Sequence, residues 1–452
     1  LEIAFTQQLT SVVHKLRSGN AFEKGSYRFW NNKKVKESCL IEKLKEQCSE
    51  NCKGLDLNVL IDSSTFNLNS KNNRLKDNEG LGLVFKDRRA KSFGFLLHPC
   101  LVYSHLPRKV IGISDVSFIT RDPQRKYSKG REWESRSEPI ENKETNCWLR
   151  ACQSSKSCLK EAQKVTFIMD RGGDITEIYD RVKDERHDVL ARSNHNRKIL
   201  TEEGKKAKLY EYINQSEPIG EITLVLNDGK RVNRSVKLTV RRVKCIFLWS
   251  KLRRVDYKKN VGGVPVTVIQ VKEESQIGGE EPICWTLVST KELIDLEQVK
   301  DEVKRYESRW LIEEYFKLLK TDGYDLENCQ LESGYSIRKL TLFVMKTSIK
   351  VLRLKAARDG KGDDKVEDVF NAQEIECLEE LNEQMEGSTE KQQNPYPKQK
   401  LAWATWIIAR LAGWKEFYNV KRPPGNKTII EGLDKFDGIM IGYNIFRKKD
   451  VS

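Results

Sequence analysis

The sequence lacks the marks of a membrane protein and of a disulfide-rich secreted protein. Within its 452 residues, no apolar run reaches the roughly 18 residues that a membrane-spanning helix needs. Residues 1–8 do not show the basic and then apolar pattern of a signal peptide, although the chain begins with Leu and can lack an N-terminal piece. The 11 cysteines are odd in number and form no pair of Cys-x2-Cys motifs, so we expect free thiols in a reducing, cytoplasmic setting.

Histidine is also scarce, whereas cations are abundant. The five His are scattered, so neither a histidine cluster nor a cysteine nucleophile is indicated. Lys and Arg together number 81 against 66 for Asp and Glu, a formal net charge of +15. This excess favours a polyanionic partner, nucleic acid before a membrane surface, although charge alone gives only non-specific affinity. A basic protein without a nucleic-acid role is the alternative. The length predicts two or three domains.

Two short apolar runs each end in an aspartate. Residues 57–61 precede Asp62, and residues 165–169 precede Asp170. A buried strand that ends in Asp presents a carboxylate at the sheet edge where ligands bind in open α/β folds. Such an Asp is often only a turn residue or a helix N-cap, and the pattern leaves this alternative open. A glycine turn after Asp170 leads into a predicted helix, for which Asp174 is the expected N-cap.

A further carboxylate lies on a helix predicted over residues 306–320. At about 100° per residue, the apolar side chains gather on one side of this helix and the polar ones on the other. Glu314 points away from the polar face, so Glu313 is the carboxylate that belongs with the nearby cations. An ordinary amphipathic helix with ion pairs at i, i+4 is the alternative. The polar face carries Tyr306, Arg309, Glu313, Lys317 and Lys320.

Asp62, Asp170 and Glu313 together define a candidate metal site. Hard divalent cations prefer oxygen ligands, and two-metal phosphoryl transfer needs carboxylates that bridge two ions about 4 Å apart. One ion would activate water or a DNA 3′-hydroxyl, while the other would stabilise the leaving oxygen. The expected cofactor is therefore Mg²⁺, two ions per site, with Mn²⁺ as a substitute.

The remaining patterns divide the chain into regions. Residues 1–55 are predicted to be mainly helical and interleave aromatics with cations, which suits either contact with DNA or packing on a neighbouring helix. An α/β core is predicted over 56–197 and 291–357. Strand-like alternation and an Asp-Gly turn predict an all-β insertion over 198–290. Residues 358–452 are predicted to be helical, with an apolar stripe that is either core or a partner-helix surface and includes Trp403, Trp406, Leu411 and Leu433.

The spacing Tyr-x2-Arg-x3-Glu-x6-Lys of the predicted helix matches the signature helix of the insertion-sequence-four family of cut-and-paste DNA transposases. Residues 59–65 also resemble the strand with that family's first catalytic Asp, and residues 167–175 resemble its Asp-Arg-x-x-Asp-Ile segment. The resemblance covers nearly the whole chain. It implies a ribonuclease-H-like catalytic core, a mixed sheet with flanking helices, in which Asp62, Asp170 and Glu313 form the DDE triad.

The same resemblance implies a set of DNA contacts. Trp285 is placed like the family's tryptophan on which a flipped base stacks, although a buried strand tryptophan is the alternative. Side chains of the signature helix would grip terminal phosphates, and a Gly-x-Tyr-Arg-Phe run near the N-terminus is shared with relatives. The implied DNA-binding residues are Tyr306, Arg309, Lys317, Lys320, Arg192, Trp285, Tyr27 and Arg28.

By this resemblance, a homodimer associated with the bacterial nucleoid would bind inverted terminal repeats and target DNA. Water would nick each end, the freed 3′-hydroxyl would attack the opposite strand to form a hairpin, and a second water would open it before joining. The C-terminal helices correspond to the region that pairs subunits in relatives.

Two departures from the family pattern stand out. The N-terminal region is shorter than in relatives, which affects binding of the transposon end, and Ser63-Ser64 replace the usual threonines. The rival hypotheses are an inactive, transposase-derived DNA-binding protein or inhibitor, and a structure-specific nuclease on the same fold.

Overall fold

The computed structural model describes residues 19–68, 75, 79–86, 91–121, 138–228, 231–249, 262–274, 282–415 and 423–450. In these ranges the chain is a mixed α/β protein, as predicted. It forms two compact units, each assembled from segments that are far apart in the sequence. The sheet unit comprises Lys53–Asp62 and Lys126–Trp310, and the helix-rich unit comprises Leu1–Cys52, Ser63–Arg125 and Leu311–Ser452. The predicted division into four regions stays a prediction.

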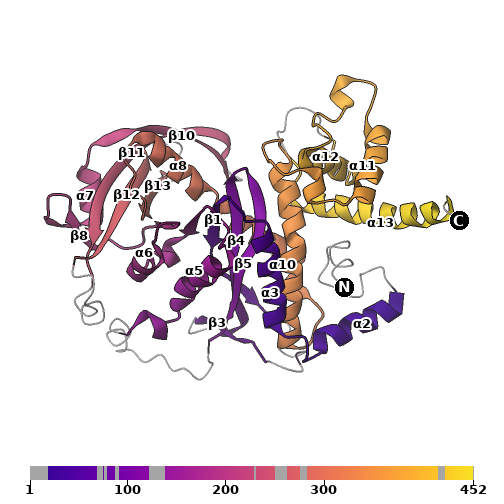
Figure 1. Ribbon diagram of the computed structural model, residues 1–452, viewed down its shortest axis with the longest axis horizontal. Coiled ribbons are helices and arrows are strands. Elements are labelled where there is room, and N and C mark those ends of the chain that lie inside the picture. The colour runs from indigo at the N-terminus through magenta and orange to yellow at the C-terminus, as the bar shows by residue number, and fades with distance from the viewer. Residues whose placement is uncertain are drawn as a thin grey trace. The chain divides into compact units, whose positions relative to one another are not determined.

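Parallel strands form one side of the sheet unit. Strand β1 (Asp56–Ile61) pairs with β6 (Lys164–Met169), and β6 pairs with β7 (His187–Arg192), all in parallel. Every residue of β1 and β6 after the first is buried, which explains why both strands are mostly apolar, with Asn58 and Thr166 as the buried polar residues. The helices α5 (Asn146–Cys158) and α6 (Thr176–Val182) pack against β1 and β7, respectively (Figure 1). The two predicted strands that precede Asp62 and Asp170 are thereby confirmed.

Antiparallel strands continue the same sheet beyond β7. The predicted hairpin is present, with Asp228 opposite Arg231, while its turn at 229–230 lies outside the described residues. The prediction of an all-β insertion is wrong in one respect, because helix α7 (Leu209–Gln215) lies in this region and buries Leu209 and Ile213, one helical turn apart. From β7 outward the order is β13 (Cys284–Ser289), β12 (Val264–Glu273), β11 (Arg231–Phe247), β8 (Lys198–Thr201) and β9 (Lys206–Lys208), and β10 (Pro218–Asp228) pairs with β11.

The helix-rich unit contains an antiparallel group of strands around β4 (Lys91–Leu106). Strand β4 pairs with β2 (Ser64–Asn67), β3 (Gly82–Lys86) and β5 (Lys109–Ile119). A Cβ at Gly94 of β4 would lie 1.9 Å from the Phe66 carbonyl oxygen, so only glycine allows β2 this close. The helices α3 (Glu37–Glu50) and α10 (Gly334–Ala357) pack on β5.

Helices make up the rest of this unit. Most of the apolar stripe predicted near the C-terminus is core here, since Trp403, Trp406 and Leu433 are at most 3% exposed, whereas Leu411 is partly exposed. No described helix has the length and apolar content needed to cross a membrane. All 11 cysteines lie in the described residues and none of them forms a disulfide there, as expected. The remaining long helices of the unit are α2 (Gly19–Asn31), α11 (Ala372–Met385), α12 (Leu401–Leu411) and α13 (Asn426–Asp450).

The single helix predicted over residues 306–320 is instead two helices. Helix α8 (Leu296–Glu307) ends before Ser308, and α9 (Trp310–Leu319) begins after Arg309. The hydroxyl of Ser308 donates to the Arg305 carbonyl at 2.6 Å and accepts from the Asn58 amide at 3.3 Å. Such side-chain bonds compete with the helical ladder, and their partner on β1 is not visible in the local sequence. Tyr306 therefore belongs to α8 and is buried, while the apolar side of α9 is buried as predicted.

Candidate functional site

Asp62 and Asp170 leave the sheet at the same edge. Ile61, the last residue of β1, lies opposite Met169, the last residue of β6, in a parallel pair. The next residue of each strand is therefore one of the two aspartates, at the carboxyl ends of adjacent strands. Both are partly exposed. Ligands bind at this edge in open α/β sheets, so the carboxylates are brought together where a ligand can reach them.

Asp170 also serves as a turn residue, which was the alternative interpretation of its position. Its Oδ1 accepts from the Gly172 amide at 2.7 Å and caps the short 3-10 helix η4 (Arg171–Gly173). A Cβ at Gly172 would lie 2.8 Å from the Trp148 ring, so the tight turn needs glycine. The cap engages one carboxylate oxygen in this bond, and a ligand could use the other.

Asp174 does not cap the helix that follows, and this prediction is wrong. The N-cap of α6 is Ile175. The Asp174 carboxylate is buried, pairs with the Arg197 guanidinium at 2.6 Å, and accepts from the Tyr179 hydroxyl at 2.9 Å. A buried carboxylate needs a cation and donors of this kind, and Arg197 lies too far along the chain for a local pattern to reveal it.

The end of α8 and the residues that follow it, up to Arg309, run alongside β1 and bring Arg309 to Asp62. Near the start of β1, Arg305 pairs with Asp56, and beyond its end Arg309 Nη1 lies 3.4 Å from Asp62 Oδ2. The side chains of Arg309 and Asp62 are 12% and 18% exposed, so this contact is only partly screened by water. The predicted association of Arg309 with a site carboxylate is present, although with Asp62.

Two more guanidiniums lie at this edge. Arg192 ends β7, next to β6, and its Nη2 donates to the Cys284 carbonyl at 3.2 Å. Burial, and then the positive charge of Arg171, lower the pKa of Arg192, and Arg309 adds to the effect. Arg171 is exposed and forms no ion pair with any residue that the structure describes. Sequence reasoning missed Arg171, and the available signal was its position directly after a strand-end aspartate.

Aromatic rings border the arginines. The rings of Trp285 and Tyr306 are 5.8 Å apart and meet edge-on at 63°. Trp285 lies on β13 and is half-buried, and its role in stacking a flipped base stays a prediction. Burial raises the pKa of Tyr306, which keeps its phenol protonated. Trp310 is 51% exposed, and the Arg309 guanidinium lies 5.5 Å from its ring centroid.

The other predicted residues of the signature helix belong to the helix-rich unit. Glu313 lies in the first turn of α9 and is partly exposed. Glu314 is engaged by Lys355 and by Lys317, whose Nζ is 3.0 Å away, so Glu313 remains the carboxylate of interest. Lys320 donates to the Thr65 carbonyl.

The aromatic and cationic run near the N-terminus packs within the helix-rich unit. Phe29 and Trp30 meet the Phe343 ring of α10 at 5.6 and 4.8 Å, as the packing alternative predicts. Burial, followed by the charges of nearby carboxylates, raises the pKa of the half-buried Tyr27. Arg28 is exposed. Their role in binding DNA stays a prediction.

The donors at the sheet edge fit part of a magnesium site. Asp62 and Asp170 supply the carboxylate oxygens that Mg²⁺ prefers. Among the residues that the structure describes, no three His, Cys, Asp or Glu side chains are grouped so that they could hold a metal ion. The sheet unit thus offers two hard ligands and a guanidinium that already contacts one of them.

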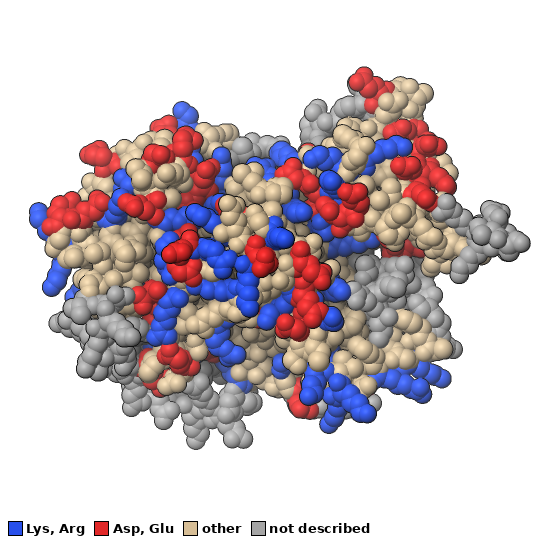
Figure 2. All heavy atoms as spheres, in the orientation of Figure 1, with Lys and Arg blue, Asp and Glu red and all other residues tan. Residues whose placement is uncertain are grey.

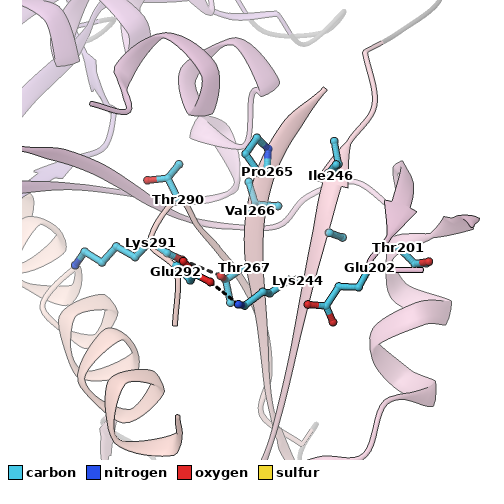
Figure 3. Close-up of a pocket in the computed structure, with 11 residues that line it drawn as sticks. Thr201, Glu202, Lys244, Ile246, Pro265, Val266, Thr267, Thr290, Lys291 and Glu292 are labelled. Atoms are coloured by element: carbon cyan, nitrogen blue, oxygen red, sulfur yellow. Dashed lines mark hydrogen bonds and ion pairs between the residues drawn. The ribbon is translucent and has the colours of Figure 1, made fainter. Parts of the chain in front are cut away.

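A separate pocket of the sheet unit, about 470 Å³ in volume, lies away from this edge (Figure 3). Its charged groups are largely satisfied internally. Lys244 pairs with Glu292 at 2.5 Å, and Lys291 pairs with Glu302 at 2.9 Å. On the face drawn in Figure 2, cations and acids are interspersed over the described surface. The described lining of the pocket contains no arginine, unlike the carboxyl edge of the sheet.

No protein-family model matches this chain. The resemblance to insertion-sequence-four transposases therefore stays a prediction. The geometry establishes something coarser, a sheet edge at which two carboxylates meet guanidiniums and aromatic rings.

Proposed function

We propose that the protein is a metal-dependent DNA transposase with a ribonuclease-H-like core, which cuts and joins the ends of a mobile element. The observation that carries the proposal is the shared carboxyl edge of β1 and β6, where Asp62 and Asp170 follow paired residues. Adjacent carboxylates at such an edge suit hard divalent cations, and the arginines beside them suit the phosphates of a polyanionic substrate. The net charge of +15 is consistent with DNA as that substrate.

Asp62 and Asp170 would hold Mg²⁺, with Glu313 as the third carboxylate by resemblance. When bound, the metal would activate the attacking oxygen and neutralise the charge of the leaving group. The protein's own residues hold the two carboxylates in position and bind the substrate. Arg309 holds the Asp62 carboxylate in place, and the bond from the Gly172 amide fixes one oxygen of Asp170. These contacts within the protein orient the two acids at the sheet edge, which favours a preorganised site.

Guanidiniums and rings at the edge would recognise the DNA end. Arg192 and Arg309 converge there, and Arg171 adds an exposed cation, so phosphates can be bound from more than one side. The protonated Tyr306 phenol can donate to a phosphate oxygen. The half-buried Trp285 offers a ring on which an extruded base can stack, as hairpin formation at a transposon end requires. Two subunits acting on paired ends would complete the reaction.

The test is cleavage of a supercoiled plasmid that carries the inverted repeats flanking the coding sequence, with Mg²⁺ or Mn²⁺. We expect hairpinned or blunt ends from the parent protein and none from Asp170→Ala. Asp301→Ala is the matched control, because Asp301 is an exposed acid on α8 of the same unit. Cutting that survives Asp170→Ala, or that needs no divalent metal, would contradict the proposal. Binding of the repeats without cutting would support the rival class, an inactive transposase-derived DNA-binding protein or inhibitor.

A further inference from the structure

The strand that follows Asp62 is held along its free edge by side chains from another segment. Residues of β2 direct their backbone groups alternately to the two sides of the strand. Toward β4, Ser64 lies opposite Leu97 and the pairing continues to Asn67. Toward the other side, the Thr65 carbonyl accepts from Lys320 Nζ and the Asn67 amide donates to Glu327 Oε1 at 2.8 Å. Two charged side chains thus form hydrogen bonds with backbone groups on the side of β2 that no described strand covers.

The ammonium group of Lys320 is surrounded by groups of the protein itself. Its Nζ lies 4.9 Å from the ring centroid of Phe66, which is 1% exposed and stacks on Phe95 at 5.3 Å. Burial lowers the pKa of Lys320, and the nearby Glu327 carboxylate opposes that shift. An ammonium that already has a carbonyl, a ring and a carboxylate beside it has little capacity left for a phosphate, which the carboxylate would also repel.

The turn that carries Glu327 is held in an unusual conformation. Asp325, just before the short 3-10 helix η6 (Leu326–Asn328), has φ +46°, the left-handed region that residues other than glycine rarely adopt. The Asn328 side-chain amide donates to both carboxylate oxygens of Asp325 at 3.0 Å and stabilises this turn. Local strain of this kind persists only where the surroundings fix it, and it is concentrated at functional sites.

The start of β2 is fixed as well. Ser63 Oγ lies 2.7 Å from Nδ1 of the fully buried His98 on β4. Burial lowers the pKa of His98 to about 4, so its ring is neutral near pH 7 and shares a hydrogen bond with the Ser63 hydroxyl. Ser63 is covalently bonded to Asp62. The chain is therefore anchored at alternate residues, 63, 65 and 67, immediately after the first proposed metal ligand.

We propose that Lys320 and Glu327 are positioning residues, which hold the free edge of β2 and thereby fix the direction in which the chain leaves Asp62. The inference rests on the proposed function for its catalytic consequence. It assigns Lys320 a different role from the phosphate grip that the family resemblance implies. Glu327 has no counterpart in that resemblance, and its negative charge excludes it from binding phosphate directly.

The test compares Lys320→Met with Glu327→Ala, using Glu327→Gln as the conservative variant because a glutamine oxygen can still accept from the Asn67 amide. Hydrogen exchange of the β2 amides is measured without DNA. Cleavage is measured in single turnover at saturating DNA, and binding to a repeat duplex is measured across salt concentrations. Lys317→Met, on the exposed side of α9, shows what loss of a lysine on this helix does to binding.

We expect Lys320→Met and Glu327→Ala to speed exchange in β2 and to slow cleavage by between about 10- and 100-fold, as small displacements of catalytic groups do. The salt dependence of binding and the half-saturating DNA concentration should not change. Glu327→Gln should behave like the parent, which a general loss of folding would not allow.

A phosphate contact would give the opposite pattern. Lys320→Met would then lower the slope of log affinity against log salt by about 1, Glu327→Ala would leave cleavage intact, and exchange in β2 would not change. Unchanged exchange in both variants overturns the positioning role whether or not the parent cuts DNA. If the variants exchange faster than the parent but the parent itself never cuts DNA, the proposed function is contradicted and the anchoring of β2 stands.

Discussion

The two ends of the parallel strands in the sheet unit use the same kinds of charged residue in different ways. At the amino ends, cations are matched by acids: Lys183 pairs with Asp188 at 2.5 Å, and Lys291 pairs with the buried Glu302 at 2.9 Å. At the carboxyl ends, Asp62 contacts Arg309, while Arg171 has no acidic partner among the described residues. Matched charges stabilise the fold, whereas unmatched cations beside carboxylates leave capacity for an anionic ligand and a metal.

The largest expected effect comes from removing an acid at the carboxyl end. Asp62→Asn keeps the side-chain volume but removes a metal ligand, so we expect DNA cleavage to fall by at least about 10³-fold, since a bound divalent cation contributes several kcal/mol. Asp56→Asn, at the other end of the same strand, breaks the pair with Arg305 and should lower the free energy of unfolding by at most about 1 kcal/mol. Single-turnover cleavage and urea unfolding of both variants measure the contrast. Equal loss of cleavage in both would remove the distinction between the two ends.

Breaking the ion pairs at the amino ends should lower the free energy of unfolding and leave the affinity for DNA unchanged. Glu302 is 2% exposed, and its carboxylate accepts from Lys291 and from the Ser289 hydroxyl at 2.6 Å. Glu302→Gln leaves the Lys291 ammonium without its charge partner, so we expect a loss of about 2–4 kcal/mol in the free energy of unfolding. The affinity for repeat DNA at 25 °C, measured with the folded protein, should stay within twofold of the parent. A large loss of affinity with normal stability would place DNA at this end as well.

The next largest effect is expected from the aromatic residues at the carboxyl end, on the rate of hairpin formation. Trp285→Ala removes a ring on which an extruded base could stack, and such stacking contributes about 1–3 kcal/mol. We therefore expect hairpin formation to slow by between about 5- and 150-fold, while nicking, which precedes base extrusion, stays near the parent rate. Trp285→Phe should recover much of the loss, because a phenyl ring still stacks. Unchanged hairpin formation in the alanine variant would show that Trp285 only packs against Tyr306.

Much of the carboxyl edge could be predicted from local sequence. The features that could not be predicted share a physical cause. The strands that lead to Asp62 and Asp170 are mostly apolar because both faces are buried, and a mostly apolar run that stops at an Asp is visible in the sequence. The break between α8 and α9 was not visible, because the Ser308 hydroxyl is held by Asn58, which lies 250 residues away. Likewise, the contact of Lys320 with Thr65 spans 255 residues.

Pairing across such separations depends on the tertiary fold and leaves no periodic pattern. The helical wheel placed Lys320 with Arg309 on one polar face, whereas the structure gives these two cations different partners, Thr65 and Asp62. Arg171 was missed for the same kind of reason. Its significance comes from Arg192 at the end of the adjacent strand β7, and strand order was not part of the sequence pattern.

The smallest expected effect is also the most direct comparison of the two ends, because the two substituted residues lie at opposite ends of one strand, β6. Lys164 begins β6 and Arg171 follows its carboxyl end, and both are exposed cations. If only the carboxyl end binds DNA, Arg171→Ala should lower the slope of log affinity against log salt by about 1, whereas Lys164→Ala should leave it unchanged. Binding to a repeat duplex and to an unrelated duplex should weaken alike, because a phosphate contact carries no base information. A slope lowered equally by both variants would mean that the protein's overall charge, and not this edge, determines where DNA lies.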